Sequence, residues 1–446
     1  MKSSFPLQAG SLALLIGLVS LPALNAQNAA GNKSQTDQVL TGQNAFSNYS
    51  QEQPGLVRKI TVADLPAPYA TQGVDNGADM VNRPNGAWPK ALPGFKVEQY
   101  YTGLDQPRLI RTAPNGDLFV AISYDDKIMV FRGVDANGKP KQVSTFVTRL
   151  NHPFGIAFYP AGPNPKWIYI GNTDSVVRIP YKNGDLKATG SAEKLADLPG
   201  GGRLRGGGHW TRDIAFSKDG QRMFVSVGSH SNDDDSDTHP EEFHRADVLE
   251  FTPEGKFVKV YASGIRNCVG EAIDPVTGEL WCSTNERDML GDNLVPDYIT
   301  HVQEGGFYGW PWFYMGHHWD PRLQGKHPEL KDKVITPDVL LDPHFASLEM
   351  TFYEGSQLPA MYKGDIFAAE HGSWNRSKRS GYEVIVAPMH DGKATGEYED
   401  FLTGFTTPDG HVWGRPVGVT VADDGSLFIT DDGSGSIWHV SYTGKK

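Results

Sequence analysis

Six times along this 446-residue chain, a turn containing glycine, proline or asparagine leads directly into a short apolar strand. A shorter apolar segment precedes most of these units, and a further apolar strand follows most of them. Repetition of such a strand–turn–strand–strand unit is typical of a radial array of small sheets. The sequence therefore predicts an all-β fold, a six-bladed β-propeller with four-stranded antiparallel blades. The six units occupy residues 113–123, 162–172, 217–229, 274–284, 362–372 and 422–432.

The two ends of the repeat region predict how the ring closes. The last apolar strand covers residues 435–442, close to the end of the sequence, and another apolar strand begins near residue 95. Pairing of these two strands would remove the free edges of an open array. A pair of packed β-sheets is the structural alternative, but the regular sixfold turn favours the propeller. The one longer interval, near residues 285–360, indicates an insertion.

The residues before the repeats differ in character from the rest. Residues 1–26 read as a secretory signal peptide, with Lys2, an apolar stretch and small residues at a cleavage point. That stretch is too short for a comfortable membrane span, and no later segment is long and apolar enough. We predict a linker and irregular N-terminal arm over residues 27–93 and the catalytic propeller over residues 94–446. Export to a periplasm is the expected location.

Charge and cysteine content restrict the partners and the compartment. The formal net charge is −12 and no run of Lys or Arg exists, which argues against nucleic acid or anionic membrane as a partner. The two cysteines, Cys268 and Cys282, flank one strand–turn–strand unit. In an oxidising compartment this spacing fits a disulfide, and two buried free thiols are the alternative.

Arginine and histidine recur beside the repeated strands. Loops on one face of a propeller converge on its axis, so these residues can meet although they are distant in sequence. Each alone is most often a solvated or salt-bridged residue, but together they indicate a pocket for a polyanion with at least one imidazole. Arginine binds carboxylates bidentately, and His209 can act as a base, although a turn histidine bonded to backbone is the alternative. The set comprises Arg108, His209, Arg266, Asn267, His371, Arg376 and Arg415.

An acidic loop follows the fourth unit. Asn285, Glu286, Asp288, Asp292 and Asp297 supply hard oxygens, which suit Ca²⁺, although the spacing is not that of an EF-hand. A second acidic run, at residues 229–242, is equally rich and reads as a mobile loop. Composition alone does not separate the two.

Several of these motifs resemble the pyrroloquinoline quinone (PQQ)-dependent sugar dehydrogenases of the glucose/sorbosone dehydrogenase family. The most specific are "GFYGWP" at 306–311, "NERDMLGD" at 285–292 and "HGSWNR" at 371–376. The wider resemblance covers roughly residues 95–443 and is closest to the L-sorbosone dehydrogenase branch. It implies a six-bladed propeller that holds PQQ in a central cleft beside a Ca²⁺ ion.

The resemblance also implies residue roles. His209 matches the catalytic base, and Arg108, Arg266, Asn267 and Arg415 match positions around the cofactor. The calcium loop comprises Asn285, Glu286, Arg287, Asp288 and Asp297, with the main-chain carbonyls of Glu286 and Arg287 as expected ligands. A lysine that the soluble glucose dehydrogenases place on the fifth blade has no clear counterpart here. His371 and Arg376 are the preferred candidates for that role, ahead of Lys378 and Arg379.

The expected function is a periplasmic quinoprotein dehydrogenase that oxidises a small sugar or sugar aldehyde by hydride transfer to PQQ. No CxxCH haem-attachment motif is present, so electrons must pass to a separate acceptor, a cytochrome or a quinone. A calcium-dependent propeller lactonase or other hydrolase is one alternative, for which the arginines are superfluous. A non-enzymatic carbohydrate-binding propeller is another, in which Trp310 and Trp312 stack on sugars rather than simply packing a loop.

Overall fold

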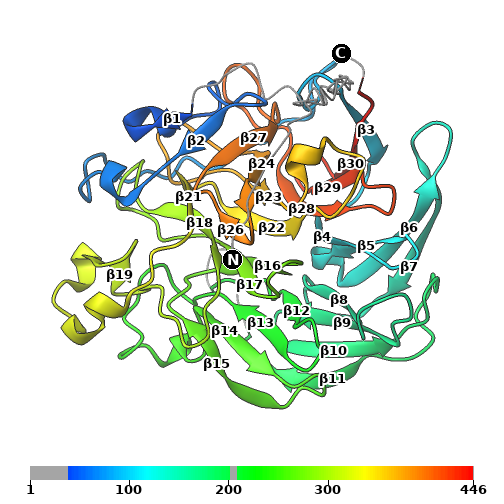
Figure 1. Ribbon diagram of the computed structural model, residues 1–446, viewed down its shortest axis with the longest axis horizontal. Helices are drawn as coiled ribbons and strands as arrows, with labels where there is room; N and C mark the ends of the chain where they lie inside the picture. The colour runs from blue at the N-terminus through cyan, green and yellow to red at the C-terminus, as the bar shows by residue number, and fades with distance from the viewer. Residues whose placement is uncertain (1–38, 201–207, 445–446) are drawn as a thin grey trace, which may run out of the picture.

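Six four-stranded antiparallel sheets are arranged around a central axis (Figure 1). The computed structural model describes residues 39–200 and 208–444, so the predicted signal peptide lies outside the described residues. The predicted fold, a six-bladed propeller with almost no helix, is confirmed. No helix in the described part of the chain is long and apolar enough to cross a bilayer.

Each blade is a consecutive run of strands from the axis outward, apart from the ring closure. The first three blades comprise β4 (Pro107–Thr112), β5 (Leu118–Ile122), β6 (Lys127–Val134) and β7 (Pro140–Val147); β8 (Ile156–Tyr159), β9 (Trp167–Asn172), β10 (Ser175–Pro180) and β11 (Glu193–Asp197); and β12 (Ile214–Phe216), β13 (Met223–Val227), β14 (Asp247–Phe251) and β15 (Phe257–Ser263).

The other three blades carry the insertions. They comprise β16 (Cys268–Ile273), β17 (Leu280–Thr284), β18 (Pro296–His301) and β21 (Val339–Pro343); β22 (Ser347–Phe352), β23 (Ile366–Glu370), β24 (Glu383–Ala387) and β27 (Tyr398–Leu402); and β28 (Pro416–Val421), β29 (Leu427–Asp431), β30 (Ser436–Tyr442) and β3 (Phe95–Tyr101). Short elements in the loops are η3 (Ser123–Asp125), η4 (Pro240–Glu242), β19 (Phe313–Tyr314), β20 (His318–Trp319), η5 (Pro321–Leu323), η6 (Pro328–Lys333), η7 (Ala360–Tyr362), β25 (Met389–His390) and β26 (Lys393–Ala394).

The ring closes between the two ends of the repeat region, as predicted. Strand β3 pairs antiparallel with β30, with Phe95 opposite Tyr442. The Phe95 ring also packs against Phe401 of the fifth blade, 5.1 Å between centroids. The sixth blade therefore takes three strands from the end of the chain and one from before the first blade.

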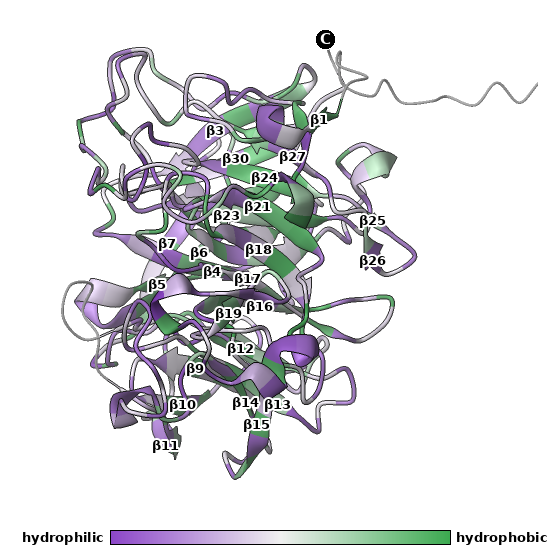
Figure 2. Ribbon diagram, turned by 90° about the vertical axis from the view of Figure 1, so that its left-hand side faces the viewer, coloured by the Kyte–Doolittle hydropathy of each residue, from purple (hydrophilic) through white to green (hydrophobic). Residues whose placement is uncertain are grey.

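Turn chemistry and burial explain why the units fold as strands. Gly116 and Gly425 occupy the turns between the first two strands of their blades with φ of +82° and +83°, a conformation that glycine adopts without steric cost. The strands that follow, β5 and β29, are buried along their whole length. Apolar side chains from neighbouring blades pack together, and Figure 2 shows these hydrophobic residues concentrated in the strands. The core is thus distributed around the ring.

The segment before β3 packs along the fifth and sixth blades. Within it, β1 (Leu40–Thr41) and β2 (Val57–Lys59) extend the fifth blade beyond β27, flanked by η1 (Gly42–Ala45) and η2 (Val62–Asp64). Further along, the main chain of Asn76 donates to the carbonyl of Trp374, and that of Val81 to the carbonyl of Val412. Residues 69–83 therefore border the loops at one end of these two blades.

A buried ion pair joins this segment to the fifth blade. Arg58, 1% exposed, pairs with Asp400 at 3.3 Å. Glu383 is completely buried beside them, and neither of its carboxylate oxygens has a hydrogen-bond partner among the described residues. Burial, together with Asp400 and Glu52, raises the pKa of Glu383 well above its ordinary value. The folded protein therefore keeps this carboxyl protonated at a pH at which the unfolded chain ionises it.

Replacement of Glu383 by Gln should stabilise the protein at pH 8 and change its free energy of unfolding little at pH 4.5. The raised pKa means that the unfolded chain releases this proton above about pH 4.5 while the folded chain retains it, so stability falls as pH rises. Removing that difference should raise the free energy of unfolding at pH 8 by about 1–3 kcal/mol. Thermal denaturation of both proteins at the two pH values measures it. An equal loss of stability at both values would mean that Glu383 is ionised and needed by Arg58.

Candidate active site

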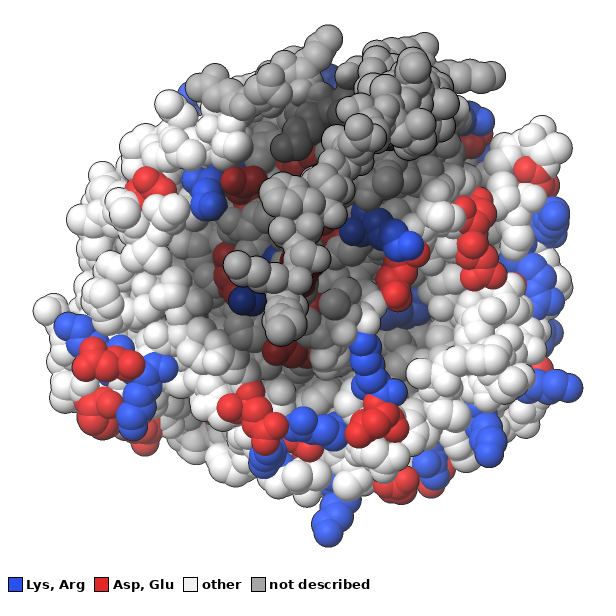
Figure 3. Space-filling view, viewed as in Figure 1, with Lys and Arg blue, Asp and Glu red and all other residues white. Residues whose placement is uncertain are grey.

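Strand pairing brings the predicted site residues to one end of the blades. Cys268, at the start of β16, lies opposite Thr284 at the end of β17, and Pro416 lies opposite Asp431 in the same way. Residues that precede an innermost strand and residues that follow its neighbour therefore emerge together. Figure 3, viewed along the axis, shows acidic and basic side chains around a hollow at the centre of the ring.

His209 is held in a defined tautomer. Its Nδ1 lies 2.9 Å from the carbonyl oxygen of Ser229 and 3.1 Å from the Ser229 hydroxyl, which itself donates to the Ser231 carbonyl. Nδ1 therefore carries the proton and donates to the Ser229 carbonyl, which leaves a lone pair on Nε2. Burial and the nearby Arg266 guanidinium lower the pKa of His209 to about 3. The imidazole is thus neutral and basic at Nε2 throughout the physiological range.

Arg266 and Asn267 lie next to His209. Arg266 donates from Nη1 to the carbonyl of Glu286 at 2.7 Å and from Nη2 to the amide oxygen of Asn232 at 2.9 Å, and it pairs with Asp288 at 3.3 Å. Asn267 donates to the Asn285 side chain at 3.1 Å, and its own Oδ1 is buried without a partner among the described residues. These contacts hold the acidic loop against the strand that precedes it.

Gly228 explains how closely these groups can pack. A Cβ at this position would lie 2.2 Å from Oδ1 of Asn267 and 2.6 Å from Cβ of His209. Any larger residue would push the two side chains apart, because such distances are far shorter than van der Waals contact. The third and fourth blades therefore place the imidazole and the amide side by side only because the residue between them is glycine.

A second cluster joins the fifth, sixth and first blades. His371 Nδ1 lies 2.9 Å from Nη2 of Arg415, which must donate, so Nε2 of His371 donates to Asp432 at 2.8 Å. Asp432 also pairs with Arg108 at 2.5 Å. Burial and Arg415 lower the pKa of His371 to about 4. The Arg108 guanidinium lies over the ring of Trp210 at 5.4 Å, which links this cluster to the chain beside His209.

Asp432 was missed by the sequence reasoning, and so were Asn232 and Ser229. Asp432 directly follows β29 of the sixth blade, as Asn285 directly follows β17 of the fourth, so its position in the repeat could have identified it. Asn232 lies in the acidic run that was interpreted as a mobile loop, yet its side chain and carbonyl both bind Arg266. This part of the run therefore contacts the candidate site.

Arg376 is not part of either cluster. It pairs with Asp342 at 2.9 Å and donates to Asn293 and Ser380, both at 2.7 Å. It is 5% exposed and holds together loops of the fourth and fifth blades. Of the two residues preferred for the fifth-blade role, only His371 lies with the arginines.

The side chains of the predicted calcium loop are largely engaged with protein groups. Asp297 accepts from the backbone of Glu286 at 2.7 Å and of Ala346 at 2.6 Å, and burial raises its pKa to about 7. Arg287 points inward to Glu286 and Asp320. Among the described residues, no three Asp, Glu, His or Cys side chains are grouped to hold a metal ion. A cation at this loop would therefore need main-chain oxygens in addition to side chains.

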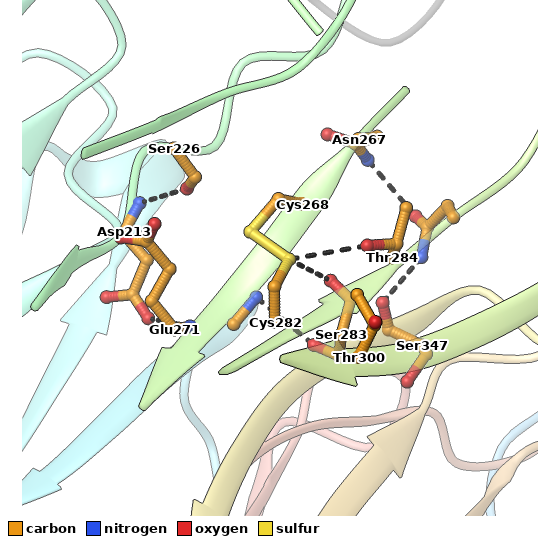
Figure 4. Close-up of a disulfide and its surroundings, with 12 residues drawn as sticks. Asp213, Ser226, Asn267, Cys268, Glu271, Cys282, Ser283, Thr284, Thr300 and Ser347 are labelled. Atoms are coloured by element: carbon orange, nitrogen blue, oxygen red, sulfur yellow. Dashed lines mark hydrogen bonds between the residues drawn. A yellow bond between two sulfur atoms is a disulfide. The ribbon is translucent and has the colours of Figure 1, made fainter. Parts of the chain in front are cut away.

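Cys268 and Cys282 form a disulfide, so the disulfide prediction is confirmed and the free-thiol alternative is wrong. The bridge joins β16 to β17 directly beneath the site (Figure 4), with Asn267 adjacent in the chain and Thr284 beside it. Both cysteines are at most 1% exposed. The bridge thus fixes the two strands whose ends carry Arg266, Asn267 and Asn285.

Replacement of both cysteines by alanine should lower the free energy of unfolding by about 3 kcal/mol, because the bridge closes a short loop in the unfolded chain. The bridged residues are 14 apart in sequence. Thermal or denaturant unfolding measures the loss, and the wild-type protein unfolded in the presence of a reductant should match the variant. An unchanged midpoint would show that the bridge contributes nothing beyond the strand pairing.

Comparison with known protein families identifies one that matches most of the propeller. The model of the "Glucose / Sorbosone dehydrogenase" family matches residues 104–375, more than half of the chain. The chain belongs to this family. A second family model, "TrAA12-like", matches residues 318–443.

Similar proteins of this sugar dehydrogenase family have been described. A PQQ-dependent pyranose dehydrogenase of Coprinopsis cinerea is 24% identical over 78% of this chain, which spans only 54% of that relative. The holo form of its PQQ domain superposes with a TM-score of 0.65 at 22% identity, covering 80% of this chain and 97% of that one. A calcium structure of the Trichoderma reesei family AA12 protein gives a TM-score of 0.66 at 18% identity, covering 83% and 99%. At these identities the structures share the fold.

Proposed function

We propose that this member of the glucose/sorbosone dehydrogenase family is a quinoprotein that oxidises a sugar or sugar aldehyde with PQQ as cofactor. The observation that carries the proposal is the neutral His209, with a lone pair on Nε2, beside Arg266 and Asn267. The family membership and the pyranose dehydrogenase relative support it. A sorbosone-like aldehyde is the finer substrate proposal.

The residues present suit PQQ, a planar quinone with three carboxylates. Three guanidinium groups, those of Arg108, Arg266 and Arg415, lie around the site on different blades, and arginine binds carboxylates in a forked geometry. Two buried polar atoms at the site, Nε of Arg108 and Oδ1 of Asn267, have no hydrogen-bond partner among the described residues. A ligand with several oxygen atoms and a ring N–H group would pair with both atoms. Its oxygen would accept from Nε of Arg108, and its N–H would donate to Oδ1 of Asn267.

His209 serves as the general base in this proposal. When bound, PQQ supplies a carbon that accepts hydride from the substrate. Nε2 of His209 takes the hydroxyl proton of the sugar, or of the hydrated aldehyde, while Nδ1 keeps its bond to the Ser229 carbonyl. Arg266 and Asn267 direct positive charge and N–H groups to the place where negative charge develops. His371 and Asp432 hold Arg415 and Arg108 in position.

Ca²⁺ is proposed as the second cofactor, at the loop after β17. Main-chain carbonyls suit this hard cation, and those of Glu286 and Arg287, with the side chains of Asn285 and Asp288, are the proposed ligands. Asp297 supports the loop from behind rather than binding the ion directly. Arg266 donates to the same Glu286 carbonyl, so this oxygen would be shared between the guanidinium and the ion. The proposal further assigns the protein to the periplasm and its electrons to a separate cytochrome or quinone.

Reconstitution tests the proposal. The mature chain is produced in a host that makes no PQQ, and dye reduction is assayed with aldoses and sugar aldehydes after addition of Ca²⁺, PQQ or both. Activity that requires both additions, and that a calcium chelator abolishes, is the expected result. Activity with PQQ after exhaustive chelation would remove calcium from the proposal. Hydrolysis of a lactone without PQQ would establish the hydrolase alternative instead.

A further inference from the structure

A large cavity adjoins the third and fourth blades. It has a volume of about 1040 Å³ and lies between the loop that joins β13 to β14, the end of β15, and the insertion that follows β18. Its walls include Phe243, Asp247, Trp310, Trp312 and Lys333. None of these residues belongs to the site described above.

A buried carboxylate faces this cavity without a partner. Asp247, the first residue of β14, is 9% exposed and lines the cavity wall. Its carboxylate forms no hydrogen bond and no ion pair with any described residue, and burial raises its pKa well above the ordinary value. Its oxygens are not fully enclosed by protein, so they are open to a ligand or to water in the cavity. The cavity therefore presents an unused hydrogen-bonding group at its inner wall.

Aromatic rings supply the rest of the chemistry. Phe243 stands at the cavity with 70% of its surface exposed, and its ring stacks on His244 at 3.9 Å. Trp310 and Trp312 are 3% and 9% exposed, which fits the alternative in which they pack a loop, and both residues also line the cavity. Glu242, Arg245, Glu304 and Lys333 also line the cavity, and aromatic rings beside polar groups suit a ligand that is apolar on its faces and carries hydroxyl groups at its edges.

We propose that this cavity is a saccharide-binding site separate from the candidate active site. Pyranose rings offer C–H faces to Phe243 and the tryptophans, and hydroxyl groups to Asp247. A purely apolar ligand would leave this carboxyl group unpaired. The volume accommodates one or two sugar rings.

The loop between β13 and β14 belongs to both sites. The Trp310 indole donates to the carbonyl of Asn232 at 3.0 Å, and Asn232 binds Arg266. Arg245, which also lines the cavity, donates to the carbonyl of Gly228 at 3.2 Å beside His209. A saccharide in the cavity would therefore bind against the loop that holds the catalytic groups, although its binding requires neither PQQ nor His209.

Calorimetric titration of the full-length, cofactor-free protein with D-glucose and with cellobiose tests the proposal. The expected result is binding at millimolar concentration that survives His209→Asn but weakens at least tenfold in Asp247→Val. The latter removes an unpaired buried carboxyl, so its melting temperature should not fall, whereas a purely structural Asp247 would lower it. Saccharide binding that persists in His209→Asn separates this site from the candidate active site. Because the titration contains no PQQ, its result does not depend on the proposed reaction.

A second pair of variants keeps the test valid if Asp247→Val fails to fold. Phe243→Ala changes an exposed ring at the cavity and should weaken binding several-fold, while Val276→Ala, equally exposed at 70% but on a turn of the fourth blade, should leave it unchanged. Equal binding in Phe243→Ala and Val276→Ala would overturn the proposal, as would the absence of binding by either sugar to the wild-type protein.

Discussion

The His209→Asn protein should fold normally and turn over its substrate about 10²–10⁴ times more slowly than the wild type, since a positioned general base contributes about this factor. Asparagine preserves a side-chain N–H for the Ser229 carbonyl but offers no basic nitrogen. Initial rates of dye reduction in the reconstituted enzyme measure the effect. His390→Asn is the matched control, since its imidazole is 80% exposed on the fifth blade, and it should retain full activity.

The acid side of the pH profile gives an independent check on this role. The pKa of His209 is lowered to about 3, so Nε2 keeps its lone pair as pH falls far below the ordinary histidine range. The value of kcat/KM should therefore stay level from pH 7 to about pH 5, instead of falling near pH 6.5. Turnover within a factor of three of wild type in His209→Asn would exclude this residue as the base.

The Arg266→Gln protein should lose about 10²–10³ in kcat and should also show a changed pH profile. Arg266 joins the Glu286 carbonyl, Asn232 and Asp288, so its removal takes away a donor aimed at the developing charge. After burial, Arg266 is also the largest cause of the low pKa of His209. Loss of the guanidinium should raise that pKa and move the acid limb of kcat/KM to higher pH.

The direction of the pH shift distinguishes electrostatic action from simple disruption. A misfolded loop would lower activity at every pH without moving the acid limb of the kcat/KM profile. Arg178→Gln serves as control, because Arg178 pairs with the exposed Glu193 at the outer edge of the second blade. An acid limb at the same pH in Arg266→Gln and wild type would contradict the electrostatic link between Arg266 and His209, whatever the loss of kcat.

The repeat pattern predicted the blades because each turn and strand is specified locally. A glycine turn, an apolar run and the next turn determine a hairpin almost without reference to the rest of the chain, and six copies determine the ring. Site positions follow from the same register: Arg266 precedes an innermost strand and Asn285 follows its neighbour, so their proximity is a property of the hairpin. The closing strand at residue 95 could be predicted for the same reason.

Contacts between loops were not predictable in this way. Arg376 and His371 are five residues apart in one motif, yet His371 faces the sixth blade and Arg376 pairs with Asp342 of the fourth. The partner of each side chain depends on which loops approach one another, and the lengths of the insertions determine which loops do so. The Asn232 contact with Arg266 likewise requires the path of the loop between β13 and β14, which composition presented only as acidic. At both places the partner is determined by tertiary contacts between loops, which the local sequence does not specify.

The pairing of β3 with β30 has a consequence for how the chain can be made. The ribosome produces residues 95–101 before any complete blade, yet their partner at residues 436–442 emerges only after the first five blades. Any nascent chain that stops short of this strand has five possible blades and an open edge. The ring therefore cannot close before residues 436–442 have been made, and a product that stops short of them is marked by an unpaired edge that proteases and chaperones can recognise.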